Sequence, residues 1–457
     1  MKLFPDTKIY VLCPGNFHSG GLEVGHQLCS KLLNFGLDAC MLYTAPDTGF
    51  NPEDPVDDFY KKYHLPYVVG NWEDKPHNIF IINEGSPHLF YWFKNARKIF
   101  WWLSVDNYFG RLNMINSYNL QNFATQPVLK YFYFNDIDAT TEHWVQSEYA
   151  RQFVKRNGIP GTKTFMVADY LNHVFLTDAV KIDLSRKKNF VAFNPKKGFQ
   201  VTQKLIELAP DIEWKPIQNM TPEQVRQLLI DSKIYIDFGN HPGKDRIPRE
   251  AAMSGCVVIT GKRGAAANEI DINIPAEFKF DESEEVLPKV IEKIRSTFEN
   301  FNSEYEKQKG YRETIADDQN RFEREIAAAF KLKIDRQINS VAAVQGFGEK
   351  SFSLVTSLLQ NKKSGLVPKF IVDDEMCKPQ VEPIQFLTRI KNTNYFHAND
   401  SGRAIFIPVI SSDDARFLYL EGRIKKFALL SPNEEEIAKR FEKIIPEPED
   451  VLTFGLT

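Results

Sequence analysis

The first 44 residues contain a strand, a glycine-containing turn, a helix and a second strand, and this order limits the folds open to the chain. Residues 8–13 are apolar enough for a buried strand, and apolar residues recur at helical spacing over residues 22–35. Gly36 follows as a C-cap, and residues 39–44 form the next predicted strand. A strand, a helix and a strand in succession predict parallel pairing. We therefore expect an α/β fold that binds ligands at the carboxyl ends of its strands.

The same alternation continues along the chain and predicts three domains. Residues 1–165 and 166–330 each form a Rossmann-like domain facing a shared cleft, and residues 331–457 form a smaller α/β module of unknown role. Further strands are predicted at residues 78–83, 98–105, 143–147, 188–194, 233–238, 256–260, 338–348, 369–374 and 403–410. Further helices are predicted at residues 148–157, 199–208, 221–231, 350–359 and 433–444, with a charged helical tract over 286–330.

Composition excludes several classes of protein. The chain has 57 Lys and Arg against 60 Asp and Glu, so the overall positive charge of a duplex-binding protein is missing and no nucleic-acid partner is expected. No apolar run approaches the roughly 18 residues of a membrane span. Pro5, Asp6 and Lys8 interrupt what would be the apolar part of a signal peptide, so we expect a cytoplasmic protein. The cysteines form no metal-binding or disulfide pattern and are expected to be reduced and buried: Cys13, Cys29, Cys40, Cys256 and Cys377.

The segment over residues 238–259 carries the strongest signal for chemistry. It contains the end of a strand, a glycine-containing loop, a helix and another strand. Within it, three cations fall in a run of six residues: Lys244, Arg246 and Arg249. Three cations in one loop could hold a diphosphate through charge-assisted hydrogen bonds, and Glu250 could accept hydrogen bonds from two ribose hydroxyls. The alternative is a helix with local ion pairs four residues apart, from Asp245 to Arg249 and from Arg246 to Glu250.

Two other turns are candidate anion sites. Asn194 begins a turn at the end of a predicted strand, and Lys196 and Lys197 place two ammonium groups before a helix, where an anion would offset their repulsion by the helix dipole. In the first domain, Gly20 and Gly21 precede a helix and leave backbone N–H groups accessible to a phosphate or sugar oxygen. A plain tight turn and unpaired surface lysines are the alternative interpretations of these two segments.

These residues resemble the GT-B glycosyltransferases, and more narrowly the retaining, sugar-nucleotide-dependent enzymes of bacterial capsule and lipopolysaccharide assembly. The matching segments are the GG turn, VQSEYARQFVKRNGI, FNPKKG and PREAAMSGCVVIT. In that family a Glu, seven residues and a second Glu hold the donor, and Glu250 matches the second position. Pro242 stands where the first Glu is expected, so this chain departs from the family there. Gly243 and the two residues after it are expected to supply that contact instead.

The resemblance implies a mechanism and an acceptor side. Lys196 or Lys197, together with Lys244 or Arg246, would neutralise the leaving diphosphate, with His18 of the first loop presented to the transferred sugar. No Asp-x-Asp motif stands in a convincing loop, so neither a metal nor another cofactor is expected. The candidates on the acceptor side follow predicted strands of the first domain, each with a plain loop residue as its alternative interpretation: Glu84, Asp106 and Asn107. The aromatic clusters at 90–93, 100–102 and 131–134 are expected to pack in the core.

The resemblance therefore predicts a hexosyltransferase-like enzyme. It would move a sugar from a UDP- or GDP-sugar to a glycan or lipid-linked acceptor in surface polysaccharide synthesis, without a metal and with retention of configuration. The catalytic candidates are His18, Lys244 and Arg246, and the donor-binding candidates are Gly20, Gly21, Asn194, Lys196, Lys197, Gly243, Arg249 and Glu250. Other GT-B enzymes, such as an epimerase or a phosphorylase, remain alternatives, as does a non-catalytic assembly subunit. The third module is a candidate for docking a partner or the inner face of the membrane.

Overall fold

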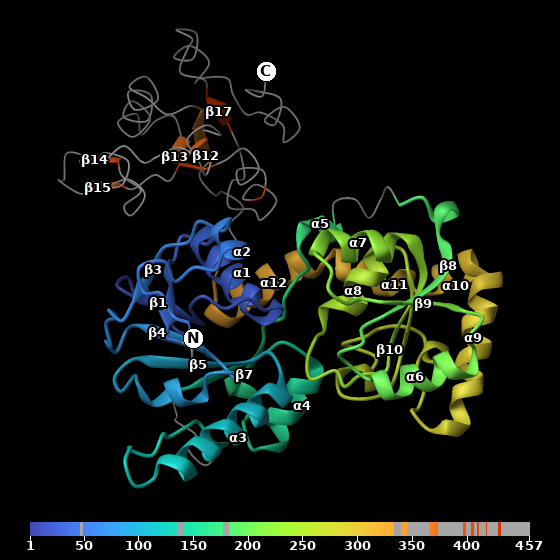
Figure 1. Ribbon diagram of the computed structural model, residues 1–457. Coiled ribbons are helices and arrows are strands. Elements are labelled where there is room, and N and C mark those ends of the chain that lie inside the picture. Colours follow the sequence, from blue (N-terminus) through green and yellow to red (C-terminus); the bar gives the residue numbers. More distant parts are fainter. Residues whose placement is uncertain are drawn as a thin grey trace. The chain divides into compact units, whose positions relative to one another are not determined.

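The structure is a computed structural model of the full chain (Figure 1). It describes residues 1–45, 49–134, 140–176, 182–332, 340–345, 366–372, 396–398, 404–405, 409–410, 417 and 428–430. The chain divides into two compact units. The first comprises residues 1–13, 19–24 and 70–333, and the second comprises residues 14–18, 25–69 and 334–457. The predicted division at residues 165 and 330, and the cleft between the first two domains, stay predictions.

The first sheet has seven strands, in the order β3-β2-β1-β4-β5-β6-β7. Its strands are β1 (Lys8–Pro14), β2 (Asp38–Thr44), β3 (Tyr67–Val69), β4 (Ile79–Asn83), β5 (Arg97–Trp102), β6 (Glu142–Val145) and β7 (Thr164–Met166). The pairings β2–β3, β1–β4, β4–β5, β5–β6 and β6–β7 are all parallel, which confirms the predicted α/β class. The five predicted strands of this region are confirmed. Two short strands, β3 and β7, escape prediction because three residues are too few to show a period.

The helices of this region begin at recognisable caps. They are α1 (Gly20–Asn34), α2 (Asp58–Lys61), α3 (Val105–Asn122), α4 (Glu148–Arg156) and α5 (His173–Leu176). Helix α1 confirms the predicted helix, and Gly36 ends it with a φ of 74°. Helix α3 is not predicted from the sequence, which favours a loop at Asp106 and Asn107. They lie instead in its first turn, because the Ser104 hydroxyl accepts a hydrogen bond from the Asn107 backbone N–H at 3.3 Å.

The second sheet has four parallel strands, in the order β11-β10-β8-β9. They are β8 (Lys188–Phe193), β9 (Glu213–Pro216), β10 (Ser232–Asp237) and β11 (Val257–Thr260). The helices α6 (Phe199–Leu208), α7 (Pro222–Asp231) and α8 (Arg246–Met253) connect them. The charged tract forms four consecutive helices, α9 (Leu287–Glu299), α10 (Phe301–Lys307), α11 (Lys309–Ala316) and α12 (Asp318–Phe330). A second parallel α/β sheet, as predicted, is therefore confirmed.

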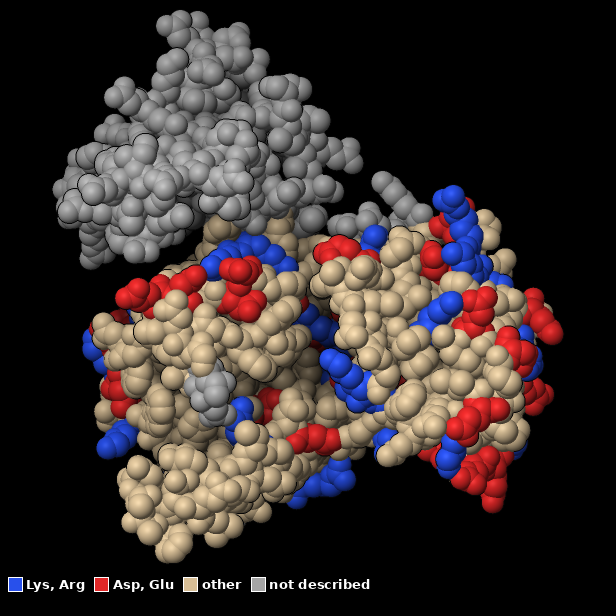
Figure 2. All heavy atoms as spheres, in the orientation of Figure 1, with Lys and Arg blue, Asp and Glu red and all other residues tan. Residues whose placement is uncertain are grey.

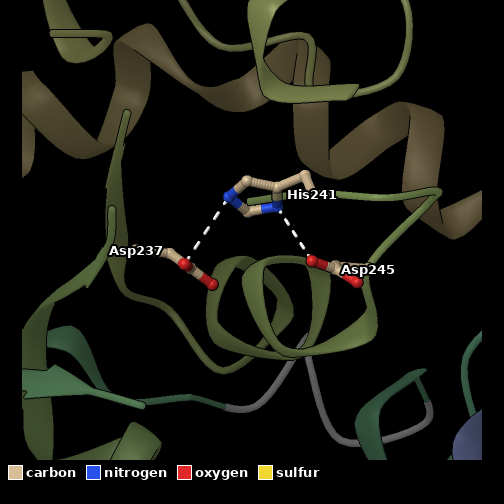
Figure 3. A group of neighbouring side chains, drawn as sticks. All are labelled: Asp237, His241 and Asp245. Carbon is tan, nitrogen blue, oxygen red and sulfur yellow. Dashed lines mark ion pairs between the residues drawn. The ribbon is translucent and has the colours of Figure 1, made fainter. Parts of the chain in front are cut away.

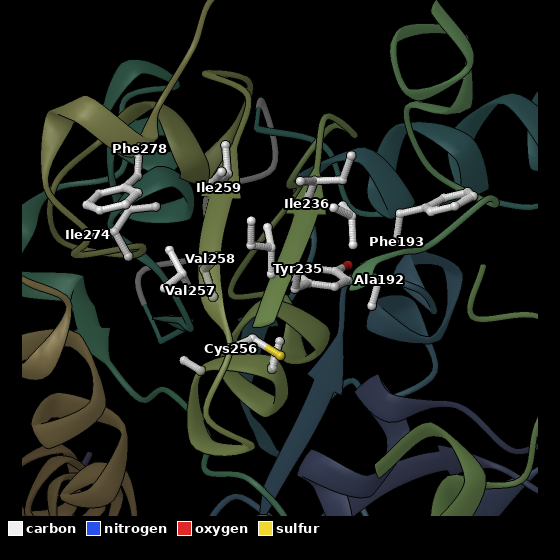
Figure 4. Packing of buried hydrophobic residues seen from close by; sticks show 14 of the residues in the cluster. Ala192, Phe193, Tyr235, Ile236, Cys256, Val257, Val258, Ile259, Ile274 and Phe278 are labelled. Carbon is white, nitrogen blue, oxygen red and sulfur yellow. The ribbon is translucent and has the colours of Figure 1, made fainter. Parts of the chain in front are cut away.

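The core of this second sheet explains why its strands are apolar on both faces. Helices cover a parallel sheet on both sides, so consecutive residues of a central strand are buried. Ile236 and Val258 are fully buried within the cluster drawn in Figure 4, and the Cys256 thiol lies among them. The free thiols of Cys13, Cys29, Cys40 and Cys256 are all buried, as expected. Cys377 lies outside the described residues.

Beyond residue 333 the described residues lie in strands, apart from Phe417. The strands β12 (Ser340–Gln345), β13 (Leu366–Val372), β16 (Val409–Ile410) and β17 (Ala428–Leu430) pair in parallel in the order β16-β13-β12-β17. The strands β14 (Phe396–Ala398) and β15 (Ala404–Ile405) form an antiparallel pair. The helices predicted at residues 350–359 and 433–444 lie outside the described residues. In the described part of the chain, no helix combines the length and the apolar character that a membrane crossing needs.

Candidate functional site

The turn after β8 and the loop after β10 lie against each other at the carboxyl ends of neighbouring strands. Gly198 has a φ of 62°, and a Cβ on it would lie 2.3 Å from the Phe238 carbonyl carbon, so only glycine fits there. The Lys197 ammonium lies 2.8 Å from an Asp245 carboxylate oxygen. In the same turn the Asn194 side chain accepts a hydrogen bond from the Lys196 backbone N–H at 3.0 Å. The structure thus brings together two of the predicted donor-binding segments.

Lys244 of the β10–α8 loop and Arg246 and Arg249 of the first turn of α8 all form ion pairs with carboxylates. Lys244 donates to Asp318 at 2.9 and 3.0 Å. Arg249 donates to the same carboxylate at 3.2 Å and to Asp169 at 2.8 Å. Arg246 pairs with Glu23. Buried charges need such partners, because an uncompensated charge away from water is costly.

These partners differ from those of the local alternative. Arg249 donates to the backbone carbonyl of Asp245 at 3.2 Å, not to its carboxylate, and among the described residues no ion pair joins Arg246 to Glu250. The alternative interpretation, with ion pairs four residues apart, is therefore wrong. The cations pair instead with residues 69 to 223 positions away in the sequence.

Burial shapes the charge state of Lys244. Loss of hydration, followed by repulsion from the Arg249 guanidinium, lowers the pKa of the Lys244 ammonium to about 8, although Asp318 acts in the opposite direction. Lys244 is therefore still largely protonated near neutral pH. It would be easier to deprotonate than an exposed lysine.

Glu250, the fifth residue of α8, has an unusual environment. Among the described residues, no side chain or backbone N–H donates a hydrogen bond to its carboxylate, although the residue is only partly exposed. Burial raises the pKa of the Glu250 carboxyl to about 7, against the opposing effects of Arg246 and Arg249. A carboxylate held near cations without a donor of its own can accept hydrogen bonds from a ligand.

The start of α1 lies beside this loop. A Cβ on Gly20 would lie 3.4 Å from the Arg246 Cδ atom, whereas one on Gly21 would have no atom within 4 Å. Both glycines are exposed. The structure therefore brings Gly20 of the predicted phosphate-binding turn next to Arg246 and Glu23, and it leaves the Gly21 backbone open.

The acceptor-side candidates divide into two kinds. Glu84 is buried, and its carboxylate accepts a hydrogen bond from the Leu103 backbone N–H at 2.9 Å. Burial raises the pKa of the Glu84 carboxyl to about 7, despite the hydrogen bonds from backbone N–H groups. Asp106 is exposed and pairs with the Asn240 side chain of the β10–α8 loop, and Asn107 is exposed beside it. Asp106 and Asn107 thus lie near the predicted donor loop, whereas Glu84 is buried beneath the end of β5.

Gly243 stands where the loop approaches the end of β5 most closely. A Cβ on Gly243 would lie 2.1 Å from the Leu103 carbonyl oxygen, and the adjacent Pro242 carbonyl accepts a hydrogen bond from the Val105 backbone N–H at 2.9 Å. Gly243 is therefore needed for backbone packing at this point. His18 belongs to the second unit, where its exposed ring stacks on Phe59 with the centroids 4.4 Å apart.

Sequence reasoning missed one further cluster in the loop, formed by Asp237, His241 and Asp245 (Figure 3). The His241 ring is fully buried. Its Nε2 lies 3.6 Å from Asp237 and its Nδ1 lies 3.0 Å from Asp245. Burial disfavours the charged ring, but the two carboxylates outweigh this and raise the pKa of His241 above its ordinary value. Each ring nitrogen faces a different carboxylate, so a protonated ring fits this cluster, although the Lys197 ammonium that pairs with Asp245 acts in the opposite direction.

The chemistry of a metal site is also present in that cluster, since one nitrogen and two carboxylate oxygens lie within 4.8 Å of one another. The expectation that the protein needs no metal stays a prediction. The position of Asp237 at the end of a predicted strand could have drawn attention to it. No local signal marks the other missed residues, Glu23, Asp169 and Asp318, because each meets its partner from a distant part of the chain.

Comparison with known proteins gives matches among solved structures only. No family model matches the sequence, and no match is found among curated proteins. Anabaena HepE in complex with UDP and glucose is 12% identical over 70% of this chain and 98% of its own, with a TM-score of 0.47. Sucrose-phosphate synthase from Thermosynechococcus elongatus is 12% identical over 71% of this chain and 100% of its own, with a TM-score of 0.45.

Proposed function

We propose that this protein is a glycosyltransferase that takes a sugar from a nucleoside-diphosphate sugar. The observation that carries the proposal is the Glu250 carboxylate. No described residue donates a hydrogen bond to it, and it lies in α8 one helical turn after Arg246. A ribose offers two neighbouring hydroxyls, and a carboxylate can accept a hydrogen bond from each. Charged acceptors of this kind form stronger hydrogen bonds than neutral ones.

The loop around Glu250 supplies the charges that the reaction needs. Glycosyl transfer breaks an anomeric C–O bond through an oxocarbenium-like transition state, while negative charge builds on the departing diphosphate. Lys244, Arg246 and Arg249 are held by carboxylates, so they would meet the diphosphate as a fixed, preorganised group. Lys196 is exposed and has no ion pair with a described residue, which leaves its ammonium available to the ligand.

The finer parts of the proposal rest on the family resemblance of the sequence. We assign the donor to the UDP- or GDP-sugars and the acceptor to a glycan or glycolipid of surface polysaccharide synthesis. Asp106 and Asn107 are the acceptor-side groups, because they are exposed next to the donor loop. Transfer would retain the anomeric configuration and would not need a metal.

Nucleotide binding tests the central claim. UDP and GDP are titrated into the full chain by calorimetry, and Glu250→Gln is compared with Glu285→Gln, an exposed glutamate elsewhere in the same unit. Loss of one charge-assisted contact, on the order of 1.5–3 kcal/mol, predicts roughly 10- to 150-fold weaker binding for Glu250→Gln. The control variant should bind the nucleotide with unchanged affinity. Equal affinities in the two variants, or no binding of either nucleotide by the wild type, would contradict the proposal.

A second candidate function is a non-catalytic assembly subunit. It is favoured by the ion pairs, because each loop cation already has a carboxylate partner and would have to share it with a diphosphate. Release of free UDP or GDP from a panel of sugar nucleotides, in the presence of a chelator, separates the two. Binding without any release of nucleoside diphosphate or transfer would favour the subunit.

A further inference from the structure

One lobe of the first unit holds a concentration of the large apolar side chains that are exposed in the described chain. The lobe consists of α3 and the segment that follows it, residues 105–134, and we call it the α3 lobe. Half of the sixteen large hydrophobic residues that are exposed in the described chain lie within it. These eight are Phe109, Met114, Tyr118, Leu120, Phe123, Val128, Leu129 and Tyr133. Leu120 and Phe123 are the most exposed of all, each at 76%.

The lobe is held in place by specific contacts. Tyr108 is buried, and its hydroxyl donates to the Phe132 carbonyl at 2.9 Å. Phe132 is buried too, and its backbone N–H donates to the Pro87 carbonyl at 2.9 Å. The Asn119 side chain both donates to and accepts from the Leu129 backbone, at 3.0 and 2.8 Å. The exposed apolar side chains are therefore carried outward on an anchored hairpin.

Charge is distributed unevenly over this surface. The α3 lobe contains two cations, Arg111 and Lys130, and one acidic residue, Asp106, which accepts a hydrogen bond from the Asn240 side chain. Figure 2 shows a broad area without charged side chains in the lower part of the view, where α3 lies in Figure 1. A region of a folded protein that exposes this many large apolar side chains commonly serves as an interaction site.

Helix α4 adds cations at the border of the lobe. The Phe153 ring of α4 meets the Phe109 ring of α3 with the centroids 5.6 Å apart, so the two helices lie side by side. Lys155 and Arg156 follow Phe153, are exposed, and form no ion pair with any described residue. The surface thus combines projecting Leu and Phe side chains with unpaired cations, which is the composition of a face that lies on an anionic bilayer.

We propose that the α3 lobe docks on the surface of an anionic lipid bilayer. A second copy of the chain fits the same surface less well, because a two-fold interface would bring two sets of unpaired cations together. A bilayer takes the apolar side chains into its interfacial region and supplies negative headgroups for Lys155 and Arg156. This inference rests on the α3 lobe and the two cations of α4, and it does not depend on the proposed enzymatic activity.

Vesicle flotation tests the proposal. The full chain is mixed with vesicles of phosphatidylcholine, with or without phosphatidylglycerol, and the bound fraction is measured. Leu120→Ser/Phe123→Ser should bind at least about tenfold more weakly than the wild type, because it removes the two most exposed apolar groups. The matched control, Leu208→Ser/Ile270→Ser, removes two apolar side chains outside the lobe that are 55% and 63% exposed. This control should bind the vesicles as the wild type does.

The charge part of the proposal has its own variant. Lys155→Gln/Arg156→Gln should lose about fivefold in affinity per cation on the anionic vesicles at low salt and little on neutral ones. Absence of wild-type binding to anionic vesicles would overturn the proposal, as would equal binding by the Leu120→Ser/Phe123→Ser variant. Sedimentation gives a separate readout: a wild-type dimer that this variant abolishes, without vesicle binding, would assign the surface to a second copy instead.

Discussion

Asp318 gives the sharpest test of the ion-pair network. Its carboxylate is completely buried, and it contacts Lys244 and Arg249, whose side chains are 7% and 1% exposed. Asp318→Asn keeps the shape of the side chain and removes its charge. Arg249 retains a second carboxylate, but Lys244 loses its only ion pair with a described residue. Removal of one partner from a buried pair costs about 3–5 kcal/mol, which corresponds to a fall in Tm of about 6–20 °C.

The same variant predicts a pH dependence with a definite sign. The pKa of Lys244 is already lowered to about 8, and loss of Asp318 should lower it further. A lysine with a lowered pKa in the folded state contributes stability above its ordinary pKa, and this is lost as the pH falls through the lowered value. The penalty of Asp318→Asn should therefore be larger at about pH 6 than at about pH 9, because the buried lysine must stay charged at the lower pH.

The neighbouring residue provides the control. Asp317 pairs with Arg324 at 2.6 Å, but both side chains are about half exposed, so Asp317→Asn should change the free energy of unfolding by no more than about 1 kcal/mol. Thermal and denaturant unfolding of both variants are measured side by side. Equal, small shifts for Asp318→Asn and Asp317→Asn would refute the reasoning from burial. Adding Lys244→Met to Asp318→Asn should recover part of the loss, because it removes the unpaired charge.

Three further predictions concern the second sheet and its loops. The two carboxylates raise the pKa of His241 and outweigh the effect of burial. The charged ring should therefore contribute its full stability below about pH 6.5, and this contribution should disappear as the pH rises. Unfolding of the wild type and of His241→Asn, compared across pH, would show this change. Lys187 is buried, and its ammonium lies 2.8–3.0 Å from four backbone carbonyl oxygens. Lys187→Met should therefore lower the free energy of unfolding by about 3–5 kcal/mol, measured with denaturant. The half-exposed Lys188→Met should lower it by about 1 kcal/mol or less. Gly198→Ala should lower the free energy of unfolding by more than about 3 kcal/mol, because the new Cβ would clash with a backbone carbonyl. Gly158→Ala has open space around it and should lower the free energy of unfolding by only about 1–2 kcal/mol, because of its positive φ. Equal losses in the two variants would contradict the steric argument.

The parallel fold could be predicted because its signals are local. Apolar runs such as residues 233–238 and 256–260 mark the strands, and the structure places β10 and β11 within one or two residues of them. Helix α3 was missed for a physical reason. It contains five Asn residues and a glycine, which favour other conformations, and burial of Tyr108, Leu112 and Ile115 offsets that preference.

The candidate site was only partly predictable. The loop sequence identifies Lys244, Arg246 and Arg249 as a cluster, since they lie within six residues. Their charge partners come from distant segments, so no spacing rule could find them. The unpartnered carboxylate of Glu250 is also a property of the folded surroundings, although the family resemblance had already marked the residue. The proposed roles of these residues await the binding experiments.

The order in which the network's members are synthesised has a consequence for biogenesis. Glu23 and Asp169 leave the ribosome before the cations of the loop, but Asp318 leaves it only after a further 69 residues beyond Arg249 have been made. Domains generally begin to fold during synthesis, so Lys244 lies in a partly formed loop without its counter-ion until Asp318 has been synthesised. We expect a nascent chain stalled before α12 to lack the Asp318 carboxylate that pairs with Lys244 and Arg249 in the complete fold.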